Sequence, residues 1–244
     1  MRIVMIVEYD GTGYCGWQRQ KSDVSVQGCI EKALLKLTQE TVDLQASGRT
    51  DAGVHALGQV AHFDTQCAIP AEKYAFALNC LLPHDIRIKK TFEASEEFHA
   101  RFHAKKKRYR YVILNARHAS AIERNHCMHV PVPLDIAKMR QAAQYIKGTH
   151  DFIALCNTKI FVTNTVRTIY EITVQKEGDK VLIELVGNGF LYNMVRIIAG
   201  TLIKIGRGKA EPAIMRRIVE DKDRKLIGMT AQPQGLFLVD VEYE

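Results

Sequence analysis

Apolar and polar positions along the chain repeat with two different periods, which predicts helices and strands in a mixed order. After Ser25, apolar residues recur every three or four positions, so residues 26–38 are predicted to form an amphipathic helix. Residues 3–10 and 59–65 have the composition and alternation of strands. Further strands are expected at 42–47, 85–94, 107–114, 166–175, 180–186 and 235–242, and further helices from Pro70 onward and at 134–146, 190–205 and 211–221.

The order of these elements is β-α-β-β-α-β in the first half of the chain and again in the second, which is the order of a ferredoxin-like fold. We therefore expect an α+β protein in which two ferredoxin-like halves, residues 1–104 and 105–244, form one mostly antiparallel sheet flanked by helices, with a central cleft. The segments 116–131 and 156–165 show no pattern that places them.

Charge is distributed unevenly along the 244 residues, whose net charge is +7. Residues 1–104 carry 11 Lys and Arg against 13 Asp and Glu, whereas residues 105–244 carry 23 against 14. The basic stretch 98–122 contains no acidic residue, and Phe102 and Tyr109 lie within it. Because cations neutralise phosphates and aromatic faces stack on unpaired bases, this stretch predicts contact with a nucleic acid. A solvated strand edge is the simpler alternative.

Several other classes of protein are disfavoured. Hydrophobic residues make up 47% and charged residues 25%, the balance of a globular protein rather than a disordered or fibrous one. No run approaches the roughly 20 apolar residues of a membrane span. The six cysteines lack metal-site spacing, which predicts reduced thiols in a cytoplasmic protein. His99 and His103 lack the acidic residue of a zinc-hydrolase helix, so no metal site is expected.

The segment Gly-Arg-Thr-Asp-Ala-Gly-Val-His at 48–55 has the character of a loop and carries a candidate acid. Its glycines allow sharp turns and a close approach of the backbone to a ligand. Asp51 lies two residues from Arg49, and an opposite charge keeps a carboxylate ionised, able to act as a nucleophile or general base. A turn in which Asp51 binds local amides is the alternative.

Two segments of the second half also carry candidate chemistry. On a strand, Tyr109 and Tyr111 share one face and Arg108 and Arg110 share the other, which offers stacking on one side and cations on the other. A tyrosine pair that faces the core is the alternative. Arg196 lies in an otherwise apolar helix, where a buried cation needs an anion as its partner.

Together these segments resemble the tRNA pseudouridine synthase A family, and the resemblance spans nearly the whole chain. The matching pieces are Tyr9-Asp10-Gly11-Thr12 with Gly16-Trp17-Gln18, residues 47–55 with Gly58-Gln59-Val60, residues 98–102, residues 108–111, Gly189-Phe190-Leu191 with Met194-Val195-Arg196, and Gly235-Leu236.

The resemblance implies an isomerase that converts uridine to pseudouridine at positions 38, 39 and 40 in the anticodon stem-loop of tRNA. It also implies a homodimer that needs no cofactor and no metal. By resemblance, Asp51 is the catalytic nucleophile, and whether it attacks the sugar, attacks the base or serves as a base stays open. Tyr109 would pack against the target base, Arg49 would help to displace it, Arg196 would pair with the aspartate, and Leu236 would make an apolar contact in the pocket.

Two other functions stay open at this point. One is the same reaction on another RNA. The other is a non-catalytic RNA-binding protein that uses the same basic cleft, although such a protein has no need of a carboxylate facing an anionic substrate. The sequence does not specify which tRNAs are preferred or how the dimer packs.

Overall fold

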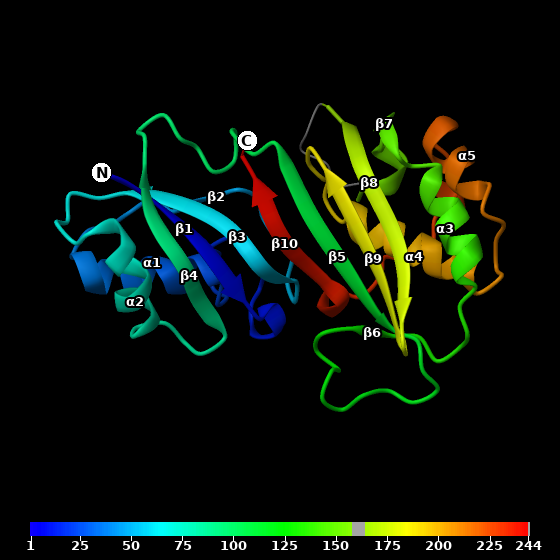
Figure 1. Ribbon diagram of the computed structural model, residues 1–244, viewed down its shortest axis with the longest axis horizontal. Coiled ribbons are helices and arrows are strands. Elements are labelled where there is room, and N and C mark those ends of the chain that lie inside the picture. Colours follow the sequence, from blue (N-terminus) through cyan, green and yellow to red (C-terminus); the bar gives the residue numbers. More distant parts are fainter. Residues whose placement is uncertain (158–163, 244) are drawn as a thin grey trace. The chain divides into compact units, whose positions relative to one another are not determined.

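The computed structural model describes residues 1–157 and 164–243. Contacts between residues group the chain into two units, which are Met1–Lys105 with Phe237–Glu244 (unit 1) and Lys106–Leu236 (unit 2). Each unit contains mostly antiparallel strands with helices packed against them (Figure 1). The expected α+β class is therefore confirmed.

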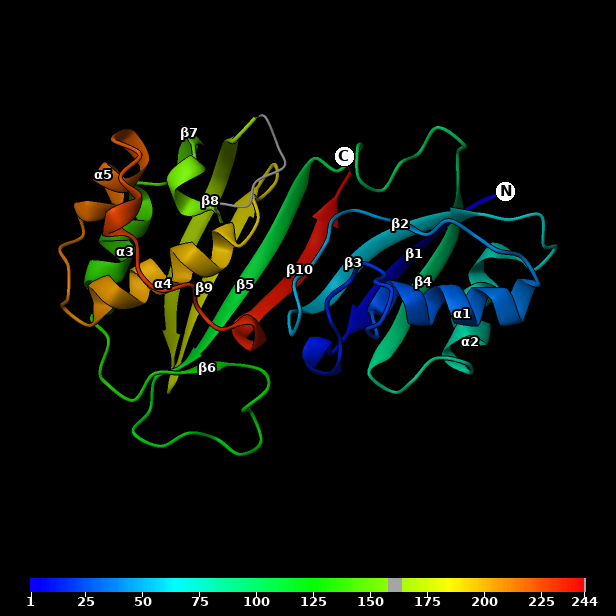
Figure 2. The same cartoon turned by 180° about the vertical axis from the view of Figure 1, so that it is seen from behind.

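Unit 1 contains strands in the order β4-β1-β3-β10, and β2 pairs with β3. Strand β1 is antiparallel to both of its neighbours, whereas β10 runs parallel to β3, with Phe237 opposite His55. Helices α1 and α2 cover one face of these strands (Figure 2). The elements are β1 (Arg2–Tyr9), η1 (Gly11–Gly13), α1 (Val26–Thr38), β2 (Gln45–Ala46), β3 (His55–Asp64), η2 (Ala71–Lys73), α2 (Tyr74–Asn79), β4 (Ile86–Ala94) and β10 (Leu236–Glu242).

Helix α1 forms where the pattern predicts it, between two local signals. Ser25 caps its first turn, since the Ser25 hydroxyl oxygen accepts from the Gly28 amide at 3.3 Å. Gln39 ends the helix in the left-handed conformation, with a φ of 61°. Between them Ile30 and Leu34 are fully buried, so the apolar face of the helix packs into unit 1.

Unit 2 contains strands in the order β5-β9-β8-β7, each antiparallel to the next, and β6 pairs with β5. Helix α3 packs on β8 and on α4, and α4 packs on β5, so one face of the strands is covered (Figure 2). The elements are β5 (Lys106–Leu114), β6 (Met128–His129), α3 (Ile136–Gln144), β7 (Gly148–Asp151), η3 (Ile153–Leu155), β8 (Val166–Glu177), β9 (Lys180–Gly187), α4 (Met194–Gly206), α5 (Ile214–Glu220), η4 (Arg224–Leu226) and η5 (Pro233–Gly235).

The structure corrects several predicted element boundaries: β2 is only Gln45–Ala46, α5 begins at Ile214, and the starts of β3 and α4 also differ. Strand β3 begins at His55 rather than at residue 59, because its first residues pair with β10, which is far away in the sequence. Helix α4 begins at Met194 rather than at residue 190, because Asn193 has a φ of 61°, a left-handed conformation that cannot continue into a helix on its N-terminal side.

The structure also bears on the two predicted halves of the chain and on the two segments for which the sequence predicted no element. The division into 1–104 and 105–244 stays a prediction, although the contacts place the last strand in unit 1. The unplaced segment 116–131 contains the short strand β6, and part of the segment 156–165 lies outside the described residues. Among the described residues, no helix is long and apolar enough to cross a membrane.

The connection between β4 and β5 is held by three histidine rings. Four consecutive backbone amides, from His99 to Phe102, donate to imidazole Nδ1 atoms: His99 to His103 at 3.3 Å, Ala100 to His62 at 3.2 Å, and Arg101 and Phe102 to His99 at 3.1 and 3.4 Å. An Nδ1 atom accepts a hydrogen bond only when it carries no proton. We call residues 99–103 the histidine turn.

His62, whose Nδ1 atom accepts from the histidine turn, makes the stability of the protein depend on pH. Burial is the main reason why the pKa of His62 falls from 6.5 to about 4, and the positive charge of Arg2 and the neighbouring His99 ring lower it further. Between these values the unfolded chain binds a proton that the folded chain does not. We therefore expect acidification from about pH 6.5 to about pH 4 to remove on the order of 3 kcal/mol from the free energy of unfolding.

This dependence is measured by urea unfolding of the wild type and of His62→Gln at both ends of the range. Glutamine offers an oxygen to the Ala100 amide but does not titrate in this range. The carboxylates contribute equally to both proteins, so the variant should lose less stability on acidification than the wild type. Equal losses in the two proteins would contradict the assignment to His62.

Candidate active site

Asp51 lies in the loop between β2 and β3, where it is half-buried, and Arg49 of the same loop is exposed. The loop closes in a turn in which the Val54 amide donates to the Asp51 carbonyl at 3.1 Å. Gly53, with a φ of 76°, supplies the left-handed residue that this turn needs. The loop therefore has a defined backbone, and the structure brings Arg49 and Asp51 together in unit 1.

The segment that follows β1 fixes this loop by close backbone contact. A Cβ atom at Gly11 would lie 2.0 Å from the Val54 carbonyl oxygen, and one at Gly16 would lie 2.5 Å from the Thr50 carbonyl oxygen. The Trp17 amide donates to that same Thr50 oxygen at 3.1 Å. The segments around Gly11 and Gly16, which also carry the family resemblance, thus pack directly against the backbone of the Asp51 loop.

Buried polar side chains also fix the Asp51 loop through hydrogen bonds. The Tyr9 hydroxyl lies 2.7 Å from the Thr50 hydroxyl, and burial raises the pKa of Tyr9 well above its usual value, so the phenol stays neutral. The Ser47 hydroxyl donates to Gln59 Oε1 at 2.6 Å, and Gln59 Nε2 donates to the Gly48 carbonyl at 2.9 Å. The backbone before Arg49 and the residue between Arg49 and Asp51 are therefore anchored.

His55 ends the loop and is 2% exposed. Its Nδ1 atom lies 3.0 Å from the Gly11 amide and 3.1 Å from Asp10 Oδ1, and its ring stacks on Phe237 with centroids 4.7 Å apart. Asp10 also caps η1 by accepting from the Thr12 amide. His55 therefore links the loop, the segment after β1 and the last strand of unit 1.

The other three predicted site residues are Tyr109, Arg196 and Leu236, and the first of them lies on β5 of unit 2. Tyr109 is 8% exposed and meets Phe190 edge to face with centroids 5.1 Å apart. Tyr111 shares its face, as predicted, and donates to the Gln232 carbonyl at 2.7 Å. On the opposite face the cations already have a partner, since Arg110 binds Glu184 at 2.6 Å and Arg108 lies 3.8 Å from it.

Arg196 lies in the first turn of α4 and is half-buried. Its Nε atom donates to the Ala231 carbonyl at 2.8 Å and its Nη1 atom donates to Asn193 Oδ1 at 3.1 Å. Leu236 begins β10, is 6% exposed, and follows Gly235, where a Cβ atom would lie 2.7 Å from the Tyr111 ring. The Arg196 side chain is thus held by groups of its own unit, and the Leu236 side chain is buried.

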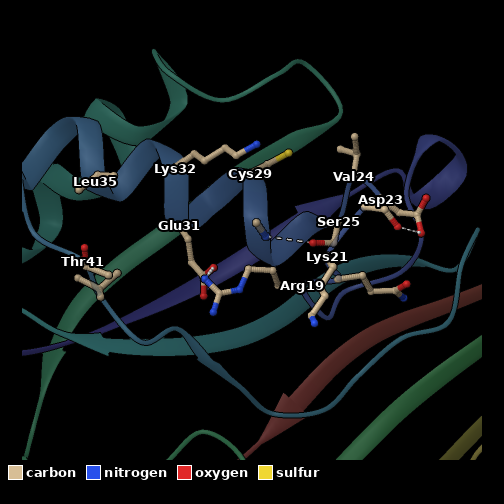
Figure 3. A pocket seen from close by; sticks show the side chains of 14 residues that line it. Arg19, Lys21, Asp23, Val24, Ser25, Cys29, Glu31, Lys32, Leu35 and Thr41 are labelled. Carbon is tan, nitrogen blue, oxygen red and sulfur yellow. Dashed lines mark hydrogen bonds and ion pairs between the residues drawn. The ribbon is translucent and has the colours of Figure 1, made fainter.

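A hollow of about 400 Å³ in unit 1 lies beside the N-terminal half of α1 (Figure 3). Its charges are mixed: Arg19 reaches across to Glu31 at 3.1 Å, and Lys21, Asp23 and Lys32 also line it. None of the five predicted site residues lines this hollow. It therefore adds nothing to the candidate site.

Four residues that support the loop were not predicted from the sequence to have a role, namely Tyr9, Thr50, His55 and Gln59. All four carry polar groups, and the structure buries each of them completely or almost so. The available signal was position, since Tyr9 and Gln59 stand in pieces that carry the family resemblance and Thr50 and His55 stand in the Asp51 segment itself.

Comparison with known proteins finds relatives along nearly the whole chain that are named for one activity. The family model described as tRNA pseudouridine synthase matches residues 5–103 and 142–244. A protein named tRNA pseudouridine synthase A from Ruminiclostridium cellulolyticum is 53% identical over 243 residues, which is 99% of each chain. One of the same name from Thermoanaerobacter sp. (strain X514) is 50% identical over 244 residues, the whole of both chains. Tyr109 lies between the two stretches that the family model matches, but within the span that is similar to these relatives.

Proposed function

The chain belongs to the tRNA pseudouridine synthase family, and from this premise we propose that it isomerises uridine at positions 38, 39 and 40 of the anticodon stem-loop, with Asp51 as the nucleophile. Membership of the family makes the protein an isomerase that acts on tRNA. The observation that supports the role of Asp51 is the fixed backbone of its loop. Gly11 and Gly16 pack against this backbone, and the Tyr9 hydroxyl binds the Thr50 side chain. A loop backbone fixed in this way gives the carboxylate that it carries a defined starting position before the substrate binds.

The reaction needs only groups that a protein chain supplies. The bond between C1′ of the ribose and N1 of the uracil breaks, the base turns, and a bond from C1′ to C5 forms, while C5 loses a proton and N1 gains one. Nothing is oxidised or reduced and no group leaves the nucleotide, so we propose that no cofactor and no metal take part. An ionised aspartate is a sufficient nucleophile for such a transfer.

The remaining residues are proposed to receive the base and to control the carboxylate. The target uridine must leave its stack, which costs a few kcal/mol, and Tyr109 and Leu236 are proposed to recover part of this by packing against it. Arg49, exposed beside Asp51, is proposed to help displace the base. Arg196 is proposed to keep the aspartate ionised and oriented, for which a guanidinium held by two fixed oxygens is well suited. We further propose that the enzyme works as a homodimer in the cytoplasm.

The proposed function is tested by incubating the protein with an unmodified tRNA transcript and mapping pseudouridine by position. We expect modification at positions 38, 39 and 40 wherever a uridine stands there, and none in a transcript with cytidine at all three. Modification elsewhere in the transcript, or no modification of tRNA at all, would contradict the proposed site and would favour the same reaction on another RNA.

The basic start of β5 is expected to bind the tRNA backbone. Replacing Lys105, Lys106 and Lys107 together by glutamine removes three cations from a stretch without acidic residues. We expect KM to rise more than kcat falls, because phosphate contacts hold the ground state and the transition state alike. The slope of log K against log salt should decrease by about 0.7 to 0.9 for each phosphate that is no longer neutralised. An unchanged slope would show that these lysines are only a solvated edge.

A further inference from the structure

The side chain of Phe102, in the histidine turn of unit 1, is 72% exposed. Single exposed hydrophobic residues are common on protein surfaces and need no explanation in themselves. Phe76 on α2, which is 79% exposed, is such a residue. What sets Phe102 apart is the fixed backbone beneath it and the charge around it.

Hydrogen bonds from all five amides and to two carbonyls of the histidine turn fix the backbone that carries Phe102. In addition to the four amides that bind imidazole nitrogens, the His103 amide donates to the His99 carbonyl at 3.1 Å. The Ala100 carbonyl accepts from the Tyr243 hydroxyl at 2.8 Å, and Ala100 itself is fully buried against Val4 and Val60. A side chain on such a base loses little further freedom when it binds a ligand.

The ring of Phe102 is also set in a cationic surrounding. The Arg101 guanidinium lies over it at 5.7 Å from its centroid, and the His99 ring lies beside it with centroids 4.3 Å apart. Both residues that flank it in the sequence, Arg101 and His103, are exposed, as is Lys105. No acidic residue occurs from Phe98 to Ile122.

These observations favour RNA over a protein partner as the ligand of this surface. A protein-docking site would need a contiguous apolar patch, whereas the exposed neighbours of Phe102 are cations and a histidine. A flat ring beside a guanidinium matches an unpaired base, whose face stacks on the ring and whose phosphate meets the cation. Because the backbone of the histidine turn is already held by hydrogen bonds, binding a base does not have to offset the entropy of ordering that turn.

We propose that Phe102 and Arg101 form a stacking platform for one unpaired base of the tRNA, a base other than the uridine that is isomerised. The proposal rests on the proposed function only in that the ligand is tRNA. The platform acts in binding and takes no part in the chemical step. Its loss should therefore raise KM and the dissociation constant while kcat at saturating tRNA stays unchanged.

The test is the equilibrium binding of the full chain to an unmodified tRNA transcript, with variants of the protein and variants of the RNA. We expect Phe102→Ala to weaken binding roughly 5- to 150-fold, the range that corresponds to the ~1–3 kcal/mol of one stacked base, and Phe102→Trp to keep most of the affinity. Phe76→Ala, an equally exposed phenylalanine of the same unit, is the matched control and should bind as the wild type does. Urea unfolding at neutral pH checks that the variants are folded.

Transcripts with a single abasic site in each unpaired position identify the base. One abasic site should weaken binding of the wild type and have no further effect on Phe102→Ala, because both changes remove the same stack. The proposal is overturned if Phe102→Ala binds within twofold of the wild type, or if its effect adds to that of every abasic site. Because these are binding measurements, they remain readable if pseudouridine mapping contradicts the proposed positions.

Discussion

Replacing Asp51 by asparagine is expected to abolish pseudouridine formation while tRNA binding stays near the wild-type level. Asparagine has almost the shape of aspartate but is no nucleophile, and removal of a nucleophile lowers kcat by roughly 10⁴-fold or more. The backbone bonds of the loop, from Val54 to the Asp51 carbonyl and from Trp17 to the Thr50 carbonyl, do not involve the carboxylate and should persist. Binding should be unchanged or slightly tighter, because a negative charge facing a polyanion is removed.

The measurement combines single-turnover mapping of pseudouridine with equilibrium binding of the same transcript. Asp43→Asn is a suitable control, since Asp43 is an exposed acid just before the same loop and its change alters the net charge equally. Retained turnover in Asp51→Asn would overturn the assignment of the nucleophile. A wild type that binds tRNA and leaves it unmodified would instead favour the non-catalytic RNA-binding protein.

The second large effect is expected from a single methyl group added at Gly11, where the backbone packs against the Asp51 loop. In Gly11→Ala the new Cβ would lie 2.0 Å from the Val54 carbonyl oxygen, which no real contact permits, so the η1 segment and the Asp51 loop must move apart. A displacement of about 1 Å in a catalytic group costs about 10²-fold in rate, and we expect kcat/KM to fall by that order. Overpacking of this kind also lowers the free energy of unfolding by about 1–3 kcal/mol.

Gly13→Ala provides the matched control in the same short 3-10 helix. A Cβ atom at Gly13 would meet nothing within 4 Å, so its rate and stability should stay near those of the wild type. The comparison is made by steady-state kinetics on tRNA together with urea unfolding of both variants. Equal kinetics in Gly11→Ala and Gly13→Ala would show that the contact with Val54 does not position the loop.

Local signals in the sequence were sufficient to predict the elements that depend on local interactions. Helix α1 occupies Val26–Thr38 as predicted, because the cap at Ser25 and the apolar period both lie within the segment itself. The start of β3 was mispredicted because it depends on Phe237, which lies far away in the sequence. The start of α4 depends on the backbone conformation of Asn193, which periodicity does not reveal.

The residues of the candidate site could be named from the sequence, where their roles stay predictions, but the contacts that hold them could not. An acid beside an arginine in a glycine-rich loop made Asp51 a candidate but left a purely structural turn open, and the family resemblance gave it a role. The contacts that hold the loop join residues far apart in sequence, as Tyr9 and Thr50 do, and polar pairs of this kind leave no period in the sequence. Only the folded chain shows that Gly11 and Gly16 serve the loop around Asp51.

The parallel pairing of β10 with β3 has a consequence for synthesis on the ribosome. Strand β10 contacts β3 at His55, the residue that ends the Asp51 loop, and Tyr243 completes the histidine turn. Domains generally fold as units while translation proceeds, but this unit receives its last strand only after residues 237–243 have emerged. A nascent chain therefore carries Asp51 long before β10 can pair with β3 at His55, next to the Asp51 loop.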